Sequence, residues 1–438
     1  METARGLAVS TNSSDVIDAL NHFHEQILGS KPDAQLILQA AATHANNVLL
    51  NVYSAAFYLY AQEDAATLIA TDYLHQAEKL LSKTNLREKL LFQATKAWQR
   101  LDYECALTLL TSVTELYPRD TLAAKFAEWI LYCTGQKYQA KRYLSLCDQM
   151  AAVNQDESHF LAMHAFAHEL NGHLSDSKRM AEKAVSLDPL TPWAHHCLSH
   201  VYLNNNDIEG GLRAMQSFQA SWENIQPLLR GHNTWHIALF HLAQRDLAAV
   251  MKLYPVIFGT LPDLVCEQLD TISLLWRMDL AGLSQDDLFA PVVSHVANKP
   301  FEQYTGFNTL HYLYCLAKAG EWQAVSQALS VLQNYIYSLS PGFNQELWQK
   351  IILPASKAVV AFVQQDYQQA YLLLKPVIAD CFLVGGSDAQ DELFTQTYLL
   401  CLIRLNKMTE AQQFFTDYLG HYKNTALAAY WFDSKGSS

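Results

Sequence analysis

Apolar residues recur along most of the chain with the three-to-four-residue spacing of an amphipathic helix. The same short arrangement returns eight times: a polar or aromatic lead, a small residue, and then an apolar run with helical period. The small residues are Ala106, Ala140, Ser177, Gly211, Ala248, Ala324, Ala370 and Ala411. The first four intervals between them are 34, 37, 34 and 37 residues, and the next, of 76, has room for two repeats.

A period near 34 residues with a small residue early in a second helix resembles the tetratricopeptide repeat. A small side chain lets two antiparallel helices approach to about 8–10 Å. The facing helix also carries a small residue twelve positions earlier in four repeats, at Ala94, Ala165, Ser199 and Ala358. Other repeats lack it, so the repeat pattern is partly degenerate.

The pattern predicts an all-α protein, a tetratricopeptide-like α-solenoid of about ten to twelve antiparallel helical hairpins. No segment is rich in β-formers, and Gly and Pro together make only 28 of 438 residues. We expect an N-terminal helical cap over residues 1–85 and the superhelical array over 86–435. One longer helix is predicted over about 341–366, and the terminal SKGSS reads as a frayed tail.

Composition and charge narrow the function classes. Half of the residues are hydrophobic and the formal net charge is −13. Because a phosphate-backbone binder needs a basic face, this balance predicts that no nucleic acid is a partner. The chain shows no signal peptide and no apolar run long enough for a membrane span, which predicts a cytoplasmic protein without membrane insertion. Its eight cysteines form no CxxC pair and are expected to be free thiols.

Histidine is concentrated in one stretch, with ten of the seventeen between His159 and His241. Three pairs stand four residues apart, a spacing that puts both rings on one helix face. These pairs fall on the first helices of consecutive hairpins: His164/His168, His196/His200 and His232/His236. They therefore predict a line of histidines along the wall of the groove.

Three interpretations of these histidines remain open. Imidazole pairs with a carboxylate can hold zinc, copper or iron, and the weak metal candidates are His196, His200, His232, His236 and Asp270. The motif is not HExxH, however, and no cysteine stands at ligand spacing, so we expect no metal and no cofactor. The alternatives are packed, hydrogen-bonded rings, or a site for a polar or anionic ligand.

Two further segments are distinctive. In GHNTWHIALFHL (231–242), Asn233 is placed to cap a helix and Trp235 to anchor a core or a ligand. In LVGGSDAQDELF (383–394), Ser387 and Gln390 form a predicted capping box after two glycines. Its exposed amides could alternatively hold an anion. Asp270 and Arg277 lie two turns apart on one helix face, where a buried ion pair is the plain expectation.

Together these pieces resemble the tetratricopeptide repeat protein 38 family over about residues 100–410. The matching segments are LYPRDTLAAKF (116–126), WAHHCLSHVY (193–202), HNTWHIAL (232–239), DTISLLWR (270–277), FNTLHYL (307–313) and VGGSDAQ (384–390). The resemblance implies a tetratricopeptide-like cytosolic protein but no particular activity. The positions it carries over are His196, His200, His232, Asn233, Trp235, His236, Asp270, Ser273, Arg277, Asn308, His311, Gly385, Gly386, Ser387 and Gln390. The family usually has Arg-Asp after the glutamine, where this chain has Asp391 and Glu392.

Two function classes follow. The first, favoured, is a non-catalytic scaffold that binds a protein or peptide partner in its concave groove. The second is a small-molecule or metal-binding pocket, with catalysis as one version of it. Its candidate ligand-binding residues are His196, His200, His232, Asn233, Trp235, His236, Asp270, Arg277, Asn308, His311 and Gln390. No nucleophile elbow, phosphate-binding loop or dinucleotide fingerprint is present.

Overall fold

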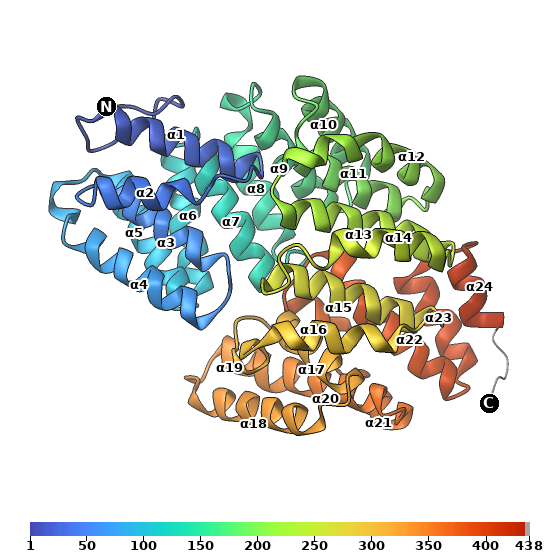
Figure 1. The fold of residues 1–438 in the computed structure, drawn as a ribbon. Helices are drawn as coiled ribbons and strands as arrows, with labels where there is room; N and C mark the ends of the chain where they lie inside the picture. The colour runs from blue at the N-terminus through green and yellow to red at the C-terminus, as the bar shows by residue number, and fades with distance from the viewer. Residues whose placement is uncertain (434–438) are drawn as a thin grey trace. The chain divides into compact units, whose positions relative to one another are not determined.

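The predicted all-α fold is confirmed. A computed structural model describes residues 1–433, and within them the chain forms 24 α-helices, the number that twelve hairpins require (Figure 1). Among these residues the only β-type pairing is an isolated bridge between Glu2 and Ala8. The protein is a tetratricopeptide-like helical solenoid. The expected frayed tail, SKGSS, lies outside the described residues.

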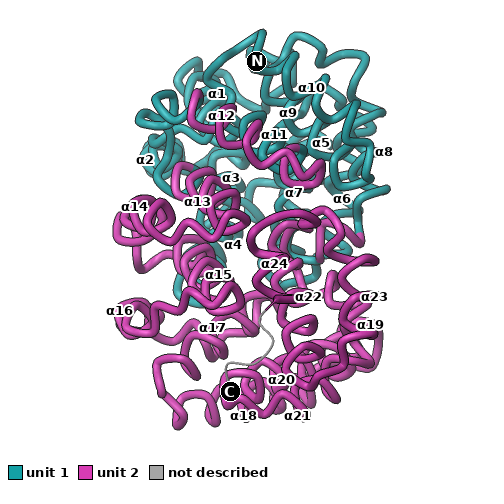
Figure 2. The backbone as a smooth tube through the Cα atoms, turned by 90° about the vertical axis from the view of Figure 1, so that its right-hand side faces the viewer, with its two compact units in different colours: residues 1–134, 139–201, 218–229 teal, residues 135–138, 202–217, 230–438 magenta. Residues whose placement is uncertain are grey.

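The helices group into two compact units, coloured separately in Figure 2. Unit 1 comprises residues 1–134, 139–201 and 218–229, and unit 2 comprises residues 135–138, 202–217 and 230–438. The boundary expected after residue 85 falls between two helices of unit 1, and a separate N-terminal cap stays a prediction.

Unit 1 consists of consecutive helices joined by short links. Within it α3 packs on α4, α5 on α6, and α9 on α10. The helices, of which α11 runs past the end of the unit, are α1 (Ser14–Leu28), α2 (Leu36–Thr43), α3 (Val48–Leu59), α4 (Asp64–Glu78), α5 (Leu86–Gln99), α6 (Tyr103–Leu116), α7 (Thr121–Thr134), α8 (Ala140–Met150), α9 (Ser158–Leu170), α10 (Leu174–Leu187) and α11 (Pro192–Asn204).

Unit 2 continues the same construction, but its last helices return to an earlier one: α22 packs against α15 as well as on α21 and α23. Its helices, of which α13 starts just before the unit, are α12 (Ile208–Phe218), α13 (Pro227–Ala243), α14 (Leu247–Ile257), α15 (Val265–Leu280), α16 (Phe289–Val296), α17 (Gly306–Lys318), α18 (Trp322–Ser338), α19 (Phe343–Leu347), α20 (Leu353–Val363), α21 (Tyr367–Leu374), α22 (Asp388–Arg404), α23 (Met408–Tyr418) and α24 (Ala426–Asp433).

The two helices of a hairpin differ in burial. In the first helix α17, twelve of the thirteen residues are buried. In its partner α18, only four of seventeen are, at helical spacing: Val325, Ala328, Leu332 and Ile336. A helix buried all round lies inside the protein, whereas a narrow apolar stripe marks a surface helix. The first helices therefore form the interior, and any polar group on them is a buried polar group.

The helix N-caps set the register of the repeats. This corrects two of the small residues that the sequence analysis had assigned to the packed position. In six second helices the residue four positions after the N-cap is buried: Ala106, Ser177, Val250, Val325, Ala370 and Ala411. The frame had chosen Ala248 and Ala324, but Ala248 is exposed and Ala324 only half-buried. Because the packed position carries valine in α14 and α18, a search for small residues selected the wrong neighbour.

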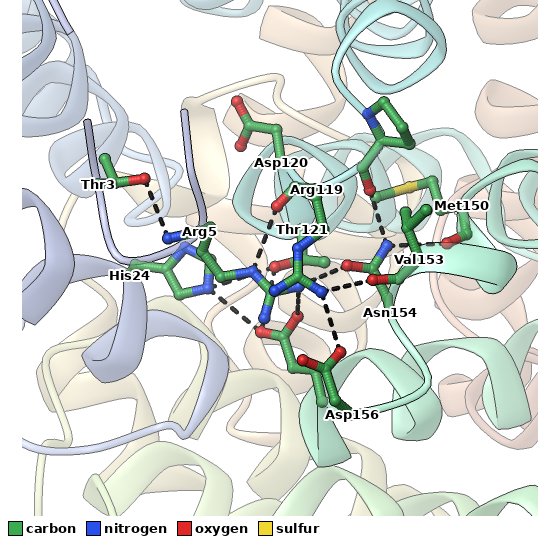
Figure 3. Close-up of polar contacts among 12 residues, drawn as sticks. Thr3, Arg5, His24, Arg119, Asp120, Thr121, Met150, Val153, Asn154 and Asp156 are labelled. Carbon is green, nitrogen blue, oxygen red and sulfur yellow. Dashed lines mark hydrogen bonds and ion pairs between the residues drawn. The ribbon is translucent and has the colours of Figure 1, made fainter. Parts of the chain in front are cut away.

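Arg5 joins the N-terminal segment to the rest of unit 1 (Figure 3). The Arg5 guanidinium donates to the Asn154 side chain and forms an ion pair with Glu157 at 2.7 Å. Its Nε also donates to the backbone oxygen of Arg119 at 3.4 Å, and the His24 ring lies 3.2 Å from Glu157. The segment thus contacts both the α6–α7 and the α8–α9 links.

The long helix predicted over 341–366 is present as α19, a π-helical segment Trp348–Ile352, and α20 in direct succession. Pro354 lies in the first turn of α20, where its missing backbone N–H removes one helical hydrogen bond. The π-helical turn immediately before it accommodates this change without ending the helix.

The sequence predicted free cysteines and no membrane span, and both features can be compared with the described residues. The eight cysteines are all free there, as predicted. Within residues 1–433, no helix combines the length and apolar character that crossing a bilayer requires.

Candidate functional site

Four sequence segments singled out by their motifs come together inside unit 2. They lie on α13, α15 and α17 and in the turn that precedes α22 (Figure 1). Each is joined to at least one of the others by a hydrogen bond or a ring contact, described below. We call this set the α13/α15/α22 site.

The centre of the site is a histidine–carboxylate pair. Nδ1 of His232 on α13 lies 3.0 and 2.9 Å from the two carboxylate oxygens of Asp270 on α15. The ring of His232 stacks on Trp235, with centres 5.4 Å apart and an interplanar angle of 11°, and meets His236 edge-on. The His232 side chain is 18% exposed and that of Asp270 is 8% exposed, so the pair reaches solvent through His232. A carboxylate on Nδ1 holds the imidazole in one orientation.

Arg277 connects α15 to the start of α22. One terminal nitrogen donates to Ser273 Oγ at 2.7 Å, and the other donates to the backbone oxygens of Ala389 and Gln390. The guanidinium carbon lies 5.3 Å from the ring centre of Trp235. The expected ion pair between Asp270 and Arg277 is therefore replaced: each side chain has a partner on a different helix. Burial lowers the pKa of Arg277, while acidic groups around it, including Glu392, oppose that change.

The glycine-rich turn before α22 is a packed and capped element. Gly385 and Gly386 both have positive φ, 109° and 95°. A Cβ on Gly386 would lie 3.0 Å from the Phe307 ring, so a side chain there would clash. The Gln390 side chain accepts the backbone N–H of Ser387 at 3.0 Å, which is the glutamine half of the predicted capping box.

The two α17 residues of the site, Asn308 and His311, have hydrogen-bond partners within their own segment. Asn308 Oδ1 accepts the hydroxyl of the N-cap Thr305 at 2.7 Å, so this side chain helps to begin the helix. Nδ1 of His311 donates to the carbonyl of Phe307 at 2.8 Å, and its ring meets Trp276 of α15. Burial lowers the pKa of His311 to about 3, so the ring is neutral at physiological pH.

Several buried polar atoms of the site have no hydrogen-bond partner among the described residues. They are Trp235 Nε1, Trp276 Nε1, Arg277 Nε, His311 Nε2 and both carboxylate oxygens of Asp391. Leaving such an atom unpaired costs about 1–3 kcal/mol. This group gathers within the same four segments, which sequence motifs alone did not reveal.

Asp391 was noted in the sequence only as a departure from the family pattern. Burial raises the pKa of its carboxyl well above the ordinary value, and nearby Asp388 adds to the increase. The adjacent Glu392 has the opposite character. Burial would raise its pKa, but His421, whose Nε2 lies 2.5 Å away, and Arg277 lower it. The pKa values of the two acidic residues that replace Arg-Asp are therefore shifted in opposite directions.

Three candidates remain: His196, His200 and Asn233. His196 and His200 belong to α11 in unit 1, where their Nε2 atoms are 3.2 Å apart and Phe166 packs against both rings. Asn233 is fully buried, and because α13 begins at Pro227 it stands inside the helix instead of capping it. The candidate ligand role of these residues stays a prediction.

For metal binding, unit 2 offers His232 and His236. One ring nitrogen of His232 lies within 4.8 Å of one of His236, and Asp270 contacts Nδ1 of His232. A carboxylate behind a histidine is the usual orientation of a metal-ligating imidazole. The sequence predicted these residues as weak metal candidates, and that role stays a prediction.

A comparison with protein-family models finds no match. Among solved structures, the chain is similar to one described as the human IFIT1 dimer with m7Gppp-AAAA, at 14% sequence identity and a TM-score of 0.42. The match covers 94% of this chain and 91% of that chain.

The comparison corrects one expectation. The sequence analysis excluded nucleic acids as partners because the chain is acidic overall. The similar chain is described with an oligonucleotide, so that exclusion is withdrawn. The physical reason is that net charge is an average over the whole surface, whereas a phosphate is held by a few local donors. A likeness of this degree carries no statement about what the present chain binds.

Proposed function

We propose that unit 2 is a receptor for a small anionic molecule, bound at the α13/α15/α22 site beside the His232–Asp270 pair. The observation that carries the proposal is the presence of two buried N–H donors, Trp235 Nε1 and Arg277 Nε, that have no acceptor within residues 1–433 and stand on side chains that contact each other. A carboxylate or phosphate offers oxygens that can accept from such donors. Charge-assisted hydrogen bonds of this kind are about twice as strong as neutral ones.

The arrangement of the site supports entry past His232. This ring covers Trp235 and is the more exposed member of the His232–Asp270 pair. Asp270 fixes the ring from behind, so a ligand that displaces or contacts His232 meets an oriented imidazole. Arg277 is held by Ser273 and by backbone oxygens, so its positive charge has a fixed position inside the protein, away from water.

Helical repeat arrays in general are scaffolds that bind partners. Our proposal concerns the kind of ligand, a small anion in place of a peptide. A peptide in a concave groove, the first expectation from the sequence, requires exposed apolar side chains along the first helices. In α15, fourteen of sixteen residues are buried and none is exposed. Burial of this helix by α14, α16, α17 and α22 favours an enclosed site over an extended peptide groove.

We also propose that the chain is a member of the tetratricopeptide repeat protein 38 family. The supporting observation is that HNTWH, DTISLLWR, FNTLH and VGGSDAQ, far apart in the sequence, are joined by side-chain contacts in unit 2. One of these contacts joins the Arg277 side chain to the backbone oxygens of Ala389 and Gln390. In addition, the backbone N–H of Phe307 donates to the carbonyl of Val384 at 2.8 Å.

The test is a ligand screen on the full chain. A panel of small carboxylates and phosphates is added to the wild-type protein, thermal shift identifies binders, and calorimetry measures their affinity. Trp235→Phe removes one donor while keeping the ring, and His232→Ala removes the oriented imidazole. We expect each variant to weaken binding by about 5-fold to 150-fold, as loss of about 1–3 kcal/mol implies.

The matched control is His241→Ala. His241 lies on the same helix, nine residues after His232, and this spacing puts the two side chains on opposite faces of the helix. The His241→Ala variant should bind the ligand as the wild type does. The proposal fails if no anion in the panel binds, or if Trp235→Phe and His241→Ala bind with the same affinity as the wild type. A melting curve of Trp235→Phe that matches the wild type separates a lost ligand contact from a lost fold.

A further inference from the structure

We infer that unit 1 contains a transition-metal site, suited to Zn²⁺, formed by Asp148, His164 and His168, with His173 as a fourth ligand. We call these four residues the α9 histidine cluster. Asp148 lies near the end of α8, His164 and His168 lie on α9, and His173 is the N-cap of α10. The site belongs to unit 1 alone and is independent of the function proposed for unit 2.

The ligand atoms already stand close together. One carboxylate oxygen of Asp148 and one ring nitrogen each of His164 and His168 lie within 4.8 Å of one another. His164 Nε2 is 2.8 Å from Asp148 Oδ1, and the two α9 rings stack with centres 4.9 Å apart. Zinc binds nitrogen and oxygen at about 2.0–2.2 Å in a tetrahedron, so the ligand atoms around one ion must lie closer to one another than 4.8 Å. Small side-chain rotations therefore suffice.

His173 extends the set across the α9–α10 turn. Its Nδ1 lies 3.4 Å from Nδ1 of His168, close to the spacing of about 3.3 Å between two ligands of one tetrahedral zinc ion. The turn that brings His173 back contains Gly172 with φ of 74°. Two imidazole nitrogens that face each other cannot both be protonated at this distance without repulsion.

The protonation state also suits a metal. Burial lowers the pKa of His164 and of His168, and the neighbouring histidines contribute to the decrease at His168. A neutral imidazole is the form that ligates. The other charged groups near the cluster are Asp176 and Arg179, which pair with each other at 2.8 Å. Because Asp176 is paired with Arg179, Asp148 is the carboxylate that contacts a ring of the cluster.

The exposure of the cluster provides an entry path. The Asp148 side chain is 58% exposed, whereas that of His164 is 3% exposed. His164 Nδ1 is buried without a partner among the described residues. The cluster thus has a fixed inner ligand and accessible outer ones. Three nitrogens and one oxygen are a ligand set that zinc commonly takes.

The test uses the full chain after treatment with a chelator and exchange into buffer without metal. Zn²⁺ binding is measured by calorimetry, and Co²⁺ serves as a spectroscopic substitute whose visible bands report tetrahedral coordination. The informative variants are Asp148→Asn and His168→Ala, because neither removes the buried His164. We expect the wild type to bind one ion at this site. Each variant should weaken it at least tenfold, and His173→Ala should weaken it less.

The chain offers a matched control in unit 2. His295 and Asp263 form another exposed histidine–carboxylate pair, with Nδ1 and Oδ1 2.9 Å apart and no further histidine bonded to it in the described part of the chain. His295→Ala should bind metal as the wild type does. A His232→Ala/His236→Ala variant identifies any ion bound in unit 2. The inference is overturned if the wild type binds no ion, or if Asp148→Asn and His168→Ala retain the wild-type stoichiometry, affinity and Co²⁺ spectrum.

Discussion

Gly211 on α12 tests the packing of unit 2 most directly. The residue is buried, and a Cβ built on it would lie 2.3 Å from two ring atoms of Phe240 and 3.0 Å from Cβ of Tyr202. Phe240 is fully buried, so its ring has no space into which to move. Replacing glycine by alanine inside a helix ordinarily stabilises it by about 1 kcal/mol. Overpacking a core costs about 1–3 kcal/mol, occasionally more.

For Gly211→Ala the second effect should dominate, because a contact of 2.3 Å between carbons requires either the buried Phe240 ring or the α12 backbone to shift. We expect the free energy of unfolding to fall by about 1–2 kcal/mol for Gly211→Ala, and by more for Gly211→Leu, which adds three further carbons. Urea unfolding followed by circular dichroism measures the change. The neighbour Gly210 is the control.

The Cβ of Gly210→Ala would meet only the side chain of Asp207, an exposed residue whose carboxylate can rotate away. Losing the bond from Gly210 N–H to Asp207 Oδ1 offsets part of the gain in helix propensity, so Gly210→Ala should be near neutral. The packing argument would be refuted by a Gly211→Ala protein as stable as the wild type, or by equal losses at both glycines.

Two further perturbations address buried charges. Because the pKa of Asp391 is raised by burial, its neutral form stabilises the fold below about pH 4, the usual pKa of an unfolded aspartate, and that stability is lost as the pH rises through the folded pKa. Asp391→Asn should therefore raise the free energy of unfolding by about 1–3 kcal/mol at pH 8 and change it little at pH 4; an equal effect at both values would contradict this. Arg87 and Asp120 form an ion pair at 2.7 Å with side chains 2% and 1% exposed. Arg87→Met leaves a buried carboxylate unpaired and should cost about 3–5 kcal/mol, and denaturation curves that coincide with the wild type would show that Asp120 is not isolated by the change.

Local information was sufficient for the fold class. Helical periodicity, a recurring small residue and sparse glycine and proline predicted an all-α solenoid, and prolines at 118 and 189 follow the ends of α6 and α10. These signals are local because a helix satisfies its own backbone hydrogen bonds, so each segment reports its own state. The repeat register was less accessible. It depends on which residue is the N-cap, and Val250 and Val325 fill positions where a search for small residues found Ala248 and Ala324.

The site needed contacts between distant helices. Motifs selected Asp270 and Arg277, but their partners, His232 and the backbone at Ala389, follow from the packing of α15 against α13 and α22. The sequence favoured a pair within one helix because two turns separate the residues, whereas the fold offered each a nearer partner on another helix. Nothing local distinguishes Asp148 from any other surface aspartate until α8 lies beside α9. Side-chain chemistry is written in the sequence, but burial and unpaired donors are properties of packing, because they depend on atoms that arrive from elsewhere in the chain.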